Sequence, residues 1–360
     1  MGREIVINGK FLGEPLNGVH RTAAHYASLL MERAEGTARV RLVAPKPVAP
    51  DPAFPRLVPE VVPGRFGARQ GWEMLSLPRI ARGALLVNFC NLAPLLHPRS
   101  VVMIHDAQTF LHPEDYTGRQ AAGYRALLPW IGRRALRILT VSEFSRGSLA
   151  DHGIGTRCKI DVVHNGTDHI LDVAPDDAVL DRHALTRGAY VMTLGSTKGY
   201  KNIGRVLAAM ESPALRGRRL VVAGGPPEAA WRSGGWSVPE GTVFTGFVSD
   251  ADLRALYAGA GAFAFPSRTE GFGLPPVEAM QCGAPVVAAR AGAMPEVCGD
   301  AALLVDPEDT EGWAEAIRAV LERADLRADL TARGRARAAT LSWAAAGDRL
   351  WSVIEPLMGR

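Results

Sequence analysis

The feature that most constrains the fold is an alternation of short apolar runs with helix-like stretches, which passes along the chain twice. Short apolar runs bounded by turn residues are typical of buried strands, and helical stretches between them indicate parallel strands joined by crossover helices. The first series begins at Glu4–Asn8 and the second at Tyr190–Leu194. The pattern predicts an α/β protein with two domains of similar size, each built on a mostly parallel sheet.

An acidic stretch at 171–188, interrupted by Pro175, separates the two series and is interpreted as the link between domains. We expect a first domain over residues 1–170 and a second over 187–341, with a final helix at 342–360 that crosses back onto the first. Expected strands are 4–8, 39–43, 83–87, 100–104, 138–141, 159–163, 190–194, 220–223, 243–247, 262–265, 285–289 and 303–305. Expected helices include 19–34, 121–137, 202–210, 250–259, 310–323 and 325–338.

The amino-acid composition indicates the cellular compartment in which the protein works. Of the 360 residues, 47% are hydrophobic, which is enough for two cores. No apolar run is long enough to predict a membrane-spanning helix. The N-terminus lacks the apolar core of a signal peptide, and the four cysteines form no C-x-x-C pair. These features predict a cytoplasmic protein with reduced thiols, and they argue against a disulfide framework or a zinc site.

The net charge of +4 is unevenly distributed, with +7 on residues 1–169 and −3 on the remainder. A basic half can meet an anionic surface, an anionic substrate or nucleic acid. The arginine usage of a GC-rich genome would give the same balance. The sequence contains no nucleic-acid module pattern, so we expect no nucleic-acid partner.

The stretch most informative about chemistry is residues 263–280, F-A-F-P-S-R-T-E-G-F-G-L-P-P-V-E-A-M. It is typical of a strand end, a loop with two glycines, and a helix whose first turn holds the paired prolines. The N–H groups at such a helix start attract phosphate. Glu270 and Glu278, one at each end of the turn, are suited to accept hydrogen bonds from hydroxyls of a sugar or a ribose. The alternative is an ordinary strand-to-helix turn with a capping glutamate.

His105 directly follows the expected strand 100–104. In open α/β sheets, functional groups gather beyond the carboxyl ends of the strands. His105 is therefore either a ligand-facing residue or a core or capping residue. Gly18 lies in the loop of the first strand–loop–helix unit, but neither half of the chain contains G-x-G-x-x-G. That absence argues against a dinucleotide-dependent oxidoreductase.

Several motifs, in order, resemble those of the family 4 glycosyltransferases, which are retaining enzymes of the GT-B fold. The most specific is E-G-F-G-L-P-P-V-E-A-M-Q-C-G-A-P-V-V-A, which is similar to the family's E-x7-E signature with Glu270 and Glu278 as the two acids. The others are V-V-M-I-H-D, I-L-T-V-S-E-F-S-R, V-V-H-N-G-T-D, G-F-V-S-D-A-D-L-R-A-L-Y-A-G-A and G-A-M-P-E-V. The resemblance covers nearly the whole chain. It implies two Rossmann-like domains with a cleft between them, the first on the acceptor side and the second binding the nucleotide sugar.

The resemblance implies that a sugar nucleotide binds in that cleft, and that His105, Lys201 and Glu270 act in catalysis. Glu270 would bind donor-sugar hydroxyls, Glu278 the ribose hydroxyls and Lys201 the phosphates. His105 would reach the donor sugar from the first domain. The further donor-binding positions it implies are Gly18, Ser196, Lys198, Val248 and the backbone N–H groups of Phe272, Gly273 and Leu274.

The sequence departs from the family pattern in one loop. The family often has an arginine directly before the phosphate lysine or a few residues earlier, whereas G-S-T-K-G-Y-K-N has Ser196 and Tyr200 at those places. Lys198 is either a second positive charge for the diphosphate or a solvated loop residue. A lysine does not form the bidentate fork of an arginine.

The resemblance further implies glycosyl transfer with retention, without a cofactor or bound metal, and no suitable loop contains a D-x-D metal motif. The expected donor is a GDP-, UDP- or dTDP-sugar, with mannose or rhamnose as the sugar. The expected acceptor is a glycan or a lipid-linked oligosaccharide of a cell-surface polysaccharide. The arginines at 125, 133, 134 and 137 would suit contact with the inner face of the membrane.

Two alternatives within the same fold are a non-catalytic sugar-nucleotide-binding protein and a GT-B sugar-nucleotide epimerase. The missing arginine favours the first. The E-x7-E arrangement argues against the second.

Overall fold

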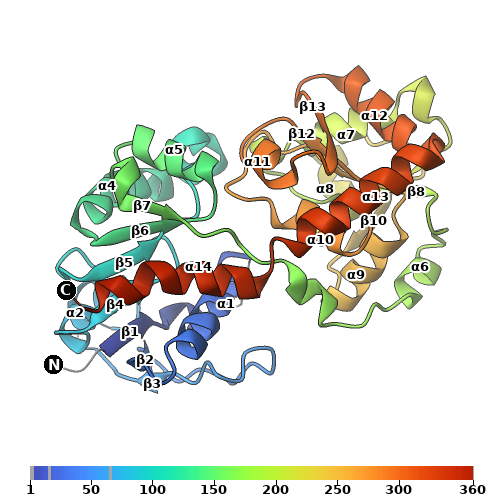
Figure 1. Ribbon diagram of the computed structural model, residues 1–360. Coiled ribbons are helices and arrows are strands. Elements are labelled where there is room, and N and C mark those ends of the chain that lie inside the picture. The colour runs from blue at the N-terminus through green and yellow to red at the C-terminus, as the bar shows by residue number, and fades with distance from the viewer. Residues whose placement is uncertain (1–3, 15–17, 65–66, 360) are drawn as a thin grey trace. The chain divides into compact units, whose positions relative to one another are not determined.

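The computed structural model describes residues 4–14, 18–64 and 67–359. The chain divides into two compact units, one formed by Met1–Asn165 with Trp343–Arg360 and the other by Gly166–Ser342. Each unit is a parallel sheet flanked by helices (Figure 1). Within the described ranges, no helix is long and apolar enough to cross a bilayer.

The first unit contains a seven-stranded sheet in the order β3-β2-β1-β4-β5-β6-β7. Its central strands are buried along their whole length because helices cover both faces of a parallel sheet. The strands are β1 (Glu4–Asn8), β2 (Arg39–Ala44), β3 (Glu60–Val61), β4 (Leu85–Asn88), β5 (Ser100–Met103), β6 (Arg137–Thr140) and β7 (Ile160–Val162). The helices are α1 (Gly18–Arg33), the π-helix Trp72–Ser76, α2 (Leu77–Ile80), α3 (Gln108–Leu111), α4 (Gly118–Arg134), α5 (Glu143–Asp151) and α14 (Trp343–Ile354).

The second unit contains a six-stranded sheet in the order β10-β9-β8-β11-β12-β13. Trp231 and Trp313 are fully buried in its core. The strands are β8 (Tyr190–Leu194), β9 (Arg219–Ala223), β10 (Val243–Gly246), β11 (Ala262–Phe265), β12 (Val286–Ala289) and β13 (Ala302–Val305). The helices are α6 (Ala178–Arg182), α7 (Ile203–Met210), α8 (Glu228–Ser233), α9 (Asp250–Gly259), α10 (Leu274–Gln281), α11 (Met294–Cys298), α12 (Thr310–Glu322) and α13 (Ala324–Ala339).

The strand order reverses once in each sheet. In the first unit the chain builds outward from β1 toward β2 on one side, and β4 pairs with β1 on the other side. In the second unit β8 pairs with β9 on one side and with β11 on the other. Loops after two such strands diverge and leave a crevice at the carboxyl ends, which is the usual ligand position in open α/β sheets. Each unit therefore has one topological switch point.

The last helix returns to the first unit, where α14 packs along α1 (Figure 1). The rings of His25 and Trp343 stack with centroids 4.2 Å apart, and Tyr26 meets Trp343 edge-on at 5.4 Å. Gly347 brings the helix backbone close to α1, since a Cβ there would lie 3.1 Å from Leu29. The expected return of this helix is confirmed.

The expected strands are confirmed to within two residues, and the caps explain several helix starts. Ser142 is the N-cap residue of α5, and its side chain accepts a hydrogen bond from the N–H of Ser145. Ser249 and Asp252 form a reciprocal capping box at the start of α9.

One expectation about the second unit is wrong. The stretch 171–188 does not link the units but lies inside the second one, where α6 packs against α9 and the Asp176 N–H donates to the Ala251 carbonyl at 3.1 Å. Sequence patterning also missed α8 and the helical segment Trp72–Ile80. Helical pieces this short contain too few turns to show a period.

Candidate functional site

The switch point of the second unit holds an ion pair between two loops. Lys201 follows β8 and Glu270 follows β11, and Lys201 Nζ lies 2.6 Å from Glu270 Oε1. The side chains are 26% and 13% exposed, so the pair is largely withdrawn from water but still reachable. The Lys201 ammonium also lies over the rings of Tyr200 and Phe265, at 5.3 and 5.8 Å from their centroids. A cation and a carboxylate therefore stand together where the topology places a ligand.

Glycines hold the backbone of Glu270 in place. Gly292 has φ +57°, and a Cβ there would lie 2.6 Å from the Glu270 nitrogen. The Ala293 N–H donates to the Glu270 carbonyl at 3.1 Å. Gly273 has φ +88°, and a Cβ on it would lie 2.1 Å from Met294 Cε. The loop before α11 is thus packed directly against the backbone that carries Glu270.

The N-terminus of α10 follows the same loop. Gly273 is its N-cap residue in the left-handed conformation, and prolines occupy the first turn. The first N–H groups of a helix have no carbonyl partner within the helix and carry the positive end of its dipole. Phe272 and Gly273 are buried, and Leu274 is half-buried. This segment combines a helix start with the nearby ammonium of Lys201, as a diphosphate site needs.

Glu278 lies in the body of α10 and is 9% exposed. Its Oε1 is 3.5 Å from Nε2 of His169. Burial and the neighbouring Glu278 charge raise the pKa of Tyr257, so the phenol stays protonated. The two glutamates therefore differ in setting, because Glu270 pairs with a lysine in a loop and Glu278 faces a histidine from a helix.

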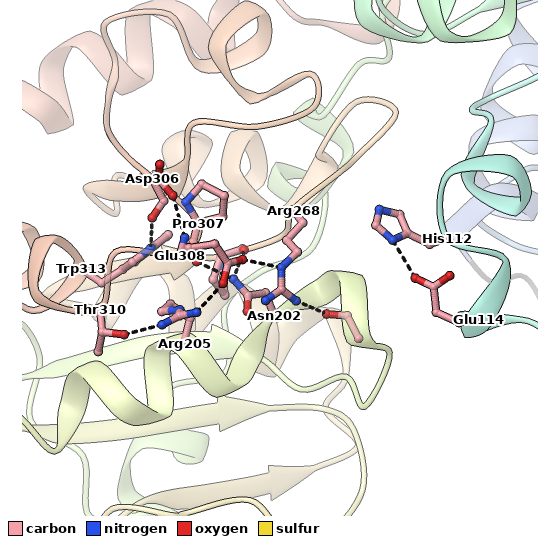
Figure 2. A network of polar contacts seen from close by, with 12 residues as sticks. His112, Glu114, Asn202, Arg205, Arg268, Asp306, Pro307, Glu308, Thr310 and Trp313 are labelled. Carbon is pink, nitrogen blue, oxygen red and sulfur yellow. Dashed lines mark hydrogen bonds and ion pairs between the residues drawn. The ribbon is translucent and has the colours of Figure 1, made fainter. Parts of the chain in front are cut away.

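A second layer of polar contacts supports the lysine loop, and its residues were not singled out from the sequence (Figure 2). The Arg268 guanidinium donates to Glu308 at 2.6 Å and to the Gly199 carbonyl at 3.0 Å. The backbone N–H of Arg268 donates to the Tyr200 carbonyl. Asn202, at φ +55°, donates to the Pro307 carbonyl at 2.8 Å. Arg268 lies two residues before the signature glutamate Glu270, in the run S-R-T-E-G, and this was the available signal.

The first unit contains two of the expected residues, His105 and Gly18. His105 follows β5 and is 7% exposed; its Nε2 donates to the Phe89 carbonyl at 2.9 Å. Burial lowers the pKa of His105 to about 4, so the ring is neutral at pH 7 and Nδ1 carries a lone pair. Asn91 accepts the His105 backbone N–H at 2.8 Å. Gly18 is exposed at the start of α1, with nothing near its would-be Cβ.

Comparison with known proteins agrees with this architecture. Residues 16–170 match the family model described as Glycosyltransferase Family 4, and residues 188–323 match that described as Glycosyl transferases group 1. The O-antigen chain mannosyltransferase B of Escherichia coli is 33% identical over 261 residues, covering 68% of this chain and 67% of the relative. The chain belongs to the family 4 glycosyltransferases.

Two further similarities are more distant. The O-antigen chain mannosyltransferase RfbU of Salmonella typhimurium is 27% identical over 64% of this chain and 63% of the relative. The crystal structure of Anabaena HepE in complex with UDP and glucose superposes with a TM-score of 0.73 at 20% identity, over 99% of this chain and 100% of that chain. At that identity the structural likeness shows the fold alone, which is GT-B.

In this glycosyltransferase the structure shows what replaces the arginine that is missing from the family pattern at 195–202. Tyr200, which stands where the family often has arginine, is 7% exposed, and its ring lies beneath both Lys198 and Lys201. Lys198 is exposed, with its Nζ 5.6 Å from the Tyr200 ring centroid, and its backbone N–H bonds Ser196 Oγ at 3.4 Å. Val248 is half-buried beyond β10, beside Phe247, which is 93% exposed. The aromatic ring gathers two cations without adding the bidentate fork of an arginine.

Proposed function

We propose that this family 4 glycosyltransferase moves mannose, with retention, from a nucleoside-diphosphate sugar to a hydroxyl of a glycan in cell-surface polysaccharide synthesis. The observation that carries the proposal is the Lys201–Glu270 pair at the switch point of the second unit, inside the E-x7-E signature. The mannosyl part rests on the O-antigen relatives.

Each charged group has a separate task in this proposal. Lys201 and the N-terminus of α10 stabilise the negative charge that develops on the diphosphate as the bond to the anomeric carbon breaks. Glu270 accepts hydrogen bonds from hydroxyls of the donor sugar. Glu278 accepts them from the ribose. Ser196, Lys198 and Val248 lie on loops after β8 and β10 and are proposed to contact the nucleotide.

Retention follows from delivery of the acceptor on the face that the leaving group occupies. The acceptor oxygen bonds to the anomeric carbon while the bond from that carbon to the phosphate oxygen breaks. The acceptor proton passes to the departing phosphate. Glu270 is a binding group in this scheme and not the nucleophile of a double displacement.

The test is a panel of GDP-, UDP- and dTDP-sugars, scored by thermal stabilisation and by slow donor hydrolysis. A ligand that binds the native state raises the unfolding temperature by mass action. We expect one mannose donor to stabilise the protein most. If no nucleotide sugar has any effect, the transferase proposal fails. Binding without transfer to any glycan acceptor would instead indicate a sugar-nucleotide-binding protein.

The division of labour between the glutamates is tested with the active donor and with its free nucleoside diphosphate. Glu270→Ala should weaken binding of the nucleotide sugar more than binding of the free nucleotide. Glu278→Ala should weaken both to a similar degree, since both carry the ribose. Equal losses for the two ligands in Glu270→Ala would refute the assignment.

A further inference from the structure

The first unit contains a cavity of about 550 Å³ at its own switch point. Asn8, at the carboxyl end of β1, and Phe89, directly after β4, contribute to its lining. Other lining residues lie on the 3₁₀ turn Lys10–Gly13, on α1, on the π-helix Trp72–Ser76 and on α4. The cavity therefore occupies the place in the first sheet that the Lys201–Glu270 pair occupies in the second.

A buried carboxylate forms part of the cavity wall. Glu73 is 5% exposed, and its oxygens accept hydrogen bonds from Asn8 Nδ2 and Lys10 Nζ, each at 2.7 Å. Each carboxylate oxygen has a second lone-pair site, so the group can accept further hydrogen bonds from a ligand. Burying an ion pair seldom stabilises a fold more than a well-packed apolar pair would. Its position in a cavity wall therefore points to a ligand.

An amide relay fixes the orientation of this carboxylate. Asn88, at the end of β4, is 1% exposed and donates to Ser100 Oγ at 3.1 Å and to the Val101 carbonyl at 3.2 Å. Its Oδ1 accepts from Asn8 Nδ2 at 3.1 Å, and the same Asn8 nitrogen donates to Glu73. The carboxylate is thus positioned from the sheet through two buried side chains.

Glu73 belongs to the π-helix Trp72–Ser76. Trp72 beside it is fully buried, and its indole N–H donates to the Val62 carbonyl at 2.8 Å. Gly64 allows the chain to pass closely, because a Cβ there would lie 2.5 Å from Trp72 Cδ1. Single-turn π-helices occur often at functional sites.

The lining selects the class of ligand. Among the described lining residues, the formal charges of Lys10 and Arg69 balance those of Glu14 and Glu73, a balance that does not favour a diphosphate. The wall combines aromatic side chains with amides and charged groups, a combination that suits the apolar faces and hydroxyl edges of a sugar ring. Burial raises the pKa of Cys90 to about 12, so this thiol adds no charge.

We propose that this cavity binds a neutral sugar ring, the terminal residue of the glycan acceptor, with Glu73 accepting hydrogen bonds from its hydroxyls. The proposal rests on the transferase function proposed above, and it names the side chains of the first unit that would select the acceptor sugar. Glu73 acts as a specificity-determining residue, and Asn8 and Asn88 act as positioning residues.

Binding is tested on the full-length protein by saturation-transfer NMR with the methyl glycosides of mannose, glucose, galactose and rhamnose. We expect at least one glycoside to bind. Glu73→Gln should weaken that binding roughly 10- to 100-fold, because hydrogen bonds to a charged acceptor are the strong ones. In transfer assays the same variant should raise the acceptor KM while leaving the donor KM unchanged.

Two controls keep the test interpretable. Glu60→Gln makes the same chemical change on an exposed strand of the same unit, where the carboxylate pairs with Arg41, and should leave glycoside binding intact. The double variant Lys10→Met with Glu73→Leu removes both partners of the buried pair, so it avoids an uncompensated charge if Glu73→Gln unfolds. It too should lose glycoside binding.

Three results would overturn the assignment. Failure of every glycoside to bind is one, and binding that Glu73→Gln leaves unaltered is another. The third is a signal from inorganic pyrophosphate that Lys10→Met abolishes and Lys201→Met preserves, which would assign the cavity to an anion. Donor binding is scored separately by thermal stabilisation. If no nucleotide sugar stabilises the protein, the transferase proposal itself fails. If a nucleotide sugar does stabilise it and one of these three results is found, only the assignment of the cavity to the acceptor fails.

Discussion

The two switch points share a topology and differ in how their charged groups are held. In the second unit, loops that directly follow β8 and β11 present Lys201 and Glu270, and glycines with positive φ allow those loops to pack. In the first unit, Glu73 comes from a π-helix far along the chain from Asn8, and buried amides orient it. Parallel α/β topology therefore sets where a site lies, and the loops decide which chemistry it holds.

The largest expected effect is a loss of transfer rate when the cation of the second site is removed. Lys201→Met should reduce the transfer rate about 10²- to 10³-fold, because it removes a preorganised cation from the developing charge of the leaving group. Lys198→Met should reduce it far less, since that side chain is exposed. Initial rates at saturating donor measure both. Equal losses would mean that the two lysines share the diphosphate.

The dependence of the second site on glycine is tested by Gly292→Ala. We expect a loss of about 3 kcal/mol in unfolding free energy, from left-handed strain together with the clash against the Glu270 nitrogen. Gly217→Ala is the matched control, because Gly217 has φ +79° but no atom near its would-be Cβ. It should lose only the strain part, about 1–2 kcal/mol. Urea unfolding compares the two variants, and similar losses would remove the argument from close packing.

The stability of the first unit should be the more sensitive to acid, because this unit contains His105, which is buried in the neutral form. The pKa of His105 is lowered to about 4 in the folded chain, so the unfolded chain binds more protons at mildly acid pH. The stability due to the neutral ring is present above pH ~6.5 and is lost as the pH falls toward 4. Between pH 8 and pH 5 the wild type should lose about 2 kcal/mol more than His105→Gln. Urea unfolding of both proteins at the two pH values measures this difference. Equal losses of unfolding free energy in the two proteins would contradict the prediction.

The smallest effect is expected from the amide relay. Asn88→Ala leaves Glu73 and Lys10 in place and removes only the group that orients Asn8. The acceptor KM should rise several-fold, less than in Glu73→Gln, while the donor KM stays constant, in keeping with about 1 kcal/mol for a neutral hydrogen bond. A rise in both constants would indicate a general loss of structure in place of a positioning role.

The same contrast explains how far sequence reasoning reached. The strands β1 and β8, the cap at Ser142 and the capping box at Ser249 follow from local patterns, because apolar periodicity and capping chemistry act over a few residues. The stretch 263–280 was informative for the same reason. Glu73 gives no local signal, since its partners lie on β1 and in the turn after it. The role of Tyr200 also needed the structure, because a buried ring between two lysines resembles any core tyrosine in sequence.

The return of α14 to the first unit bears on the order in which the protein acquires structure during synthesis. Domains generally fold as they emerge from the ribosome, the N-terminal one first. Here the second unit, Gly166–Ser342, is continuous and has all its residues before the first unit receives Trp343. Until then the α1 surface around His25 and Tyr26 lacks its cover. A premature stop within residues 343–360 would therefore leave the later-made unit whole and the unit made first unfinished.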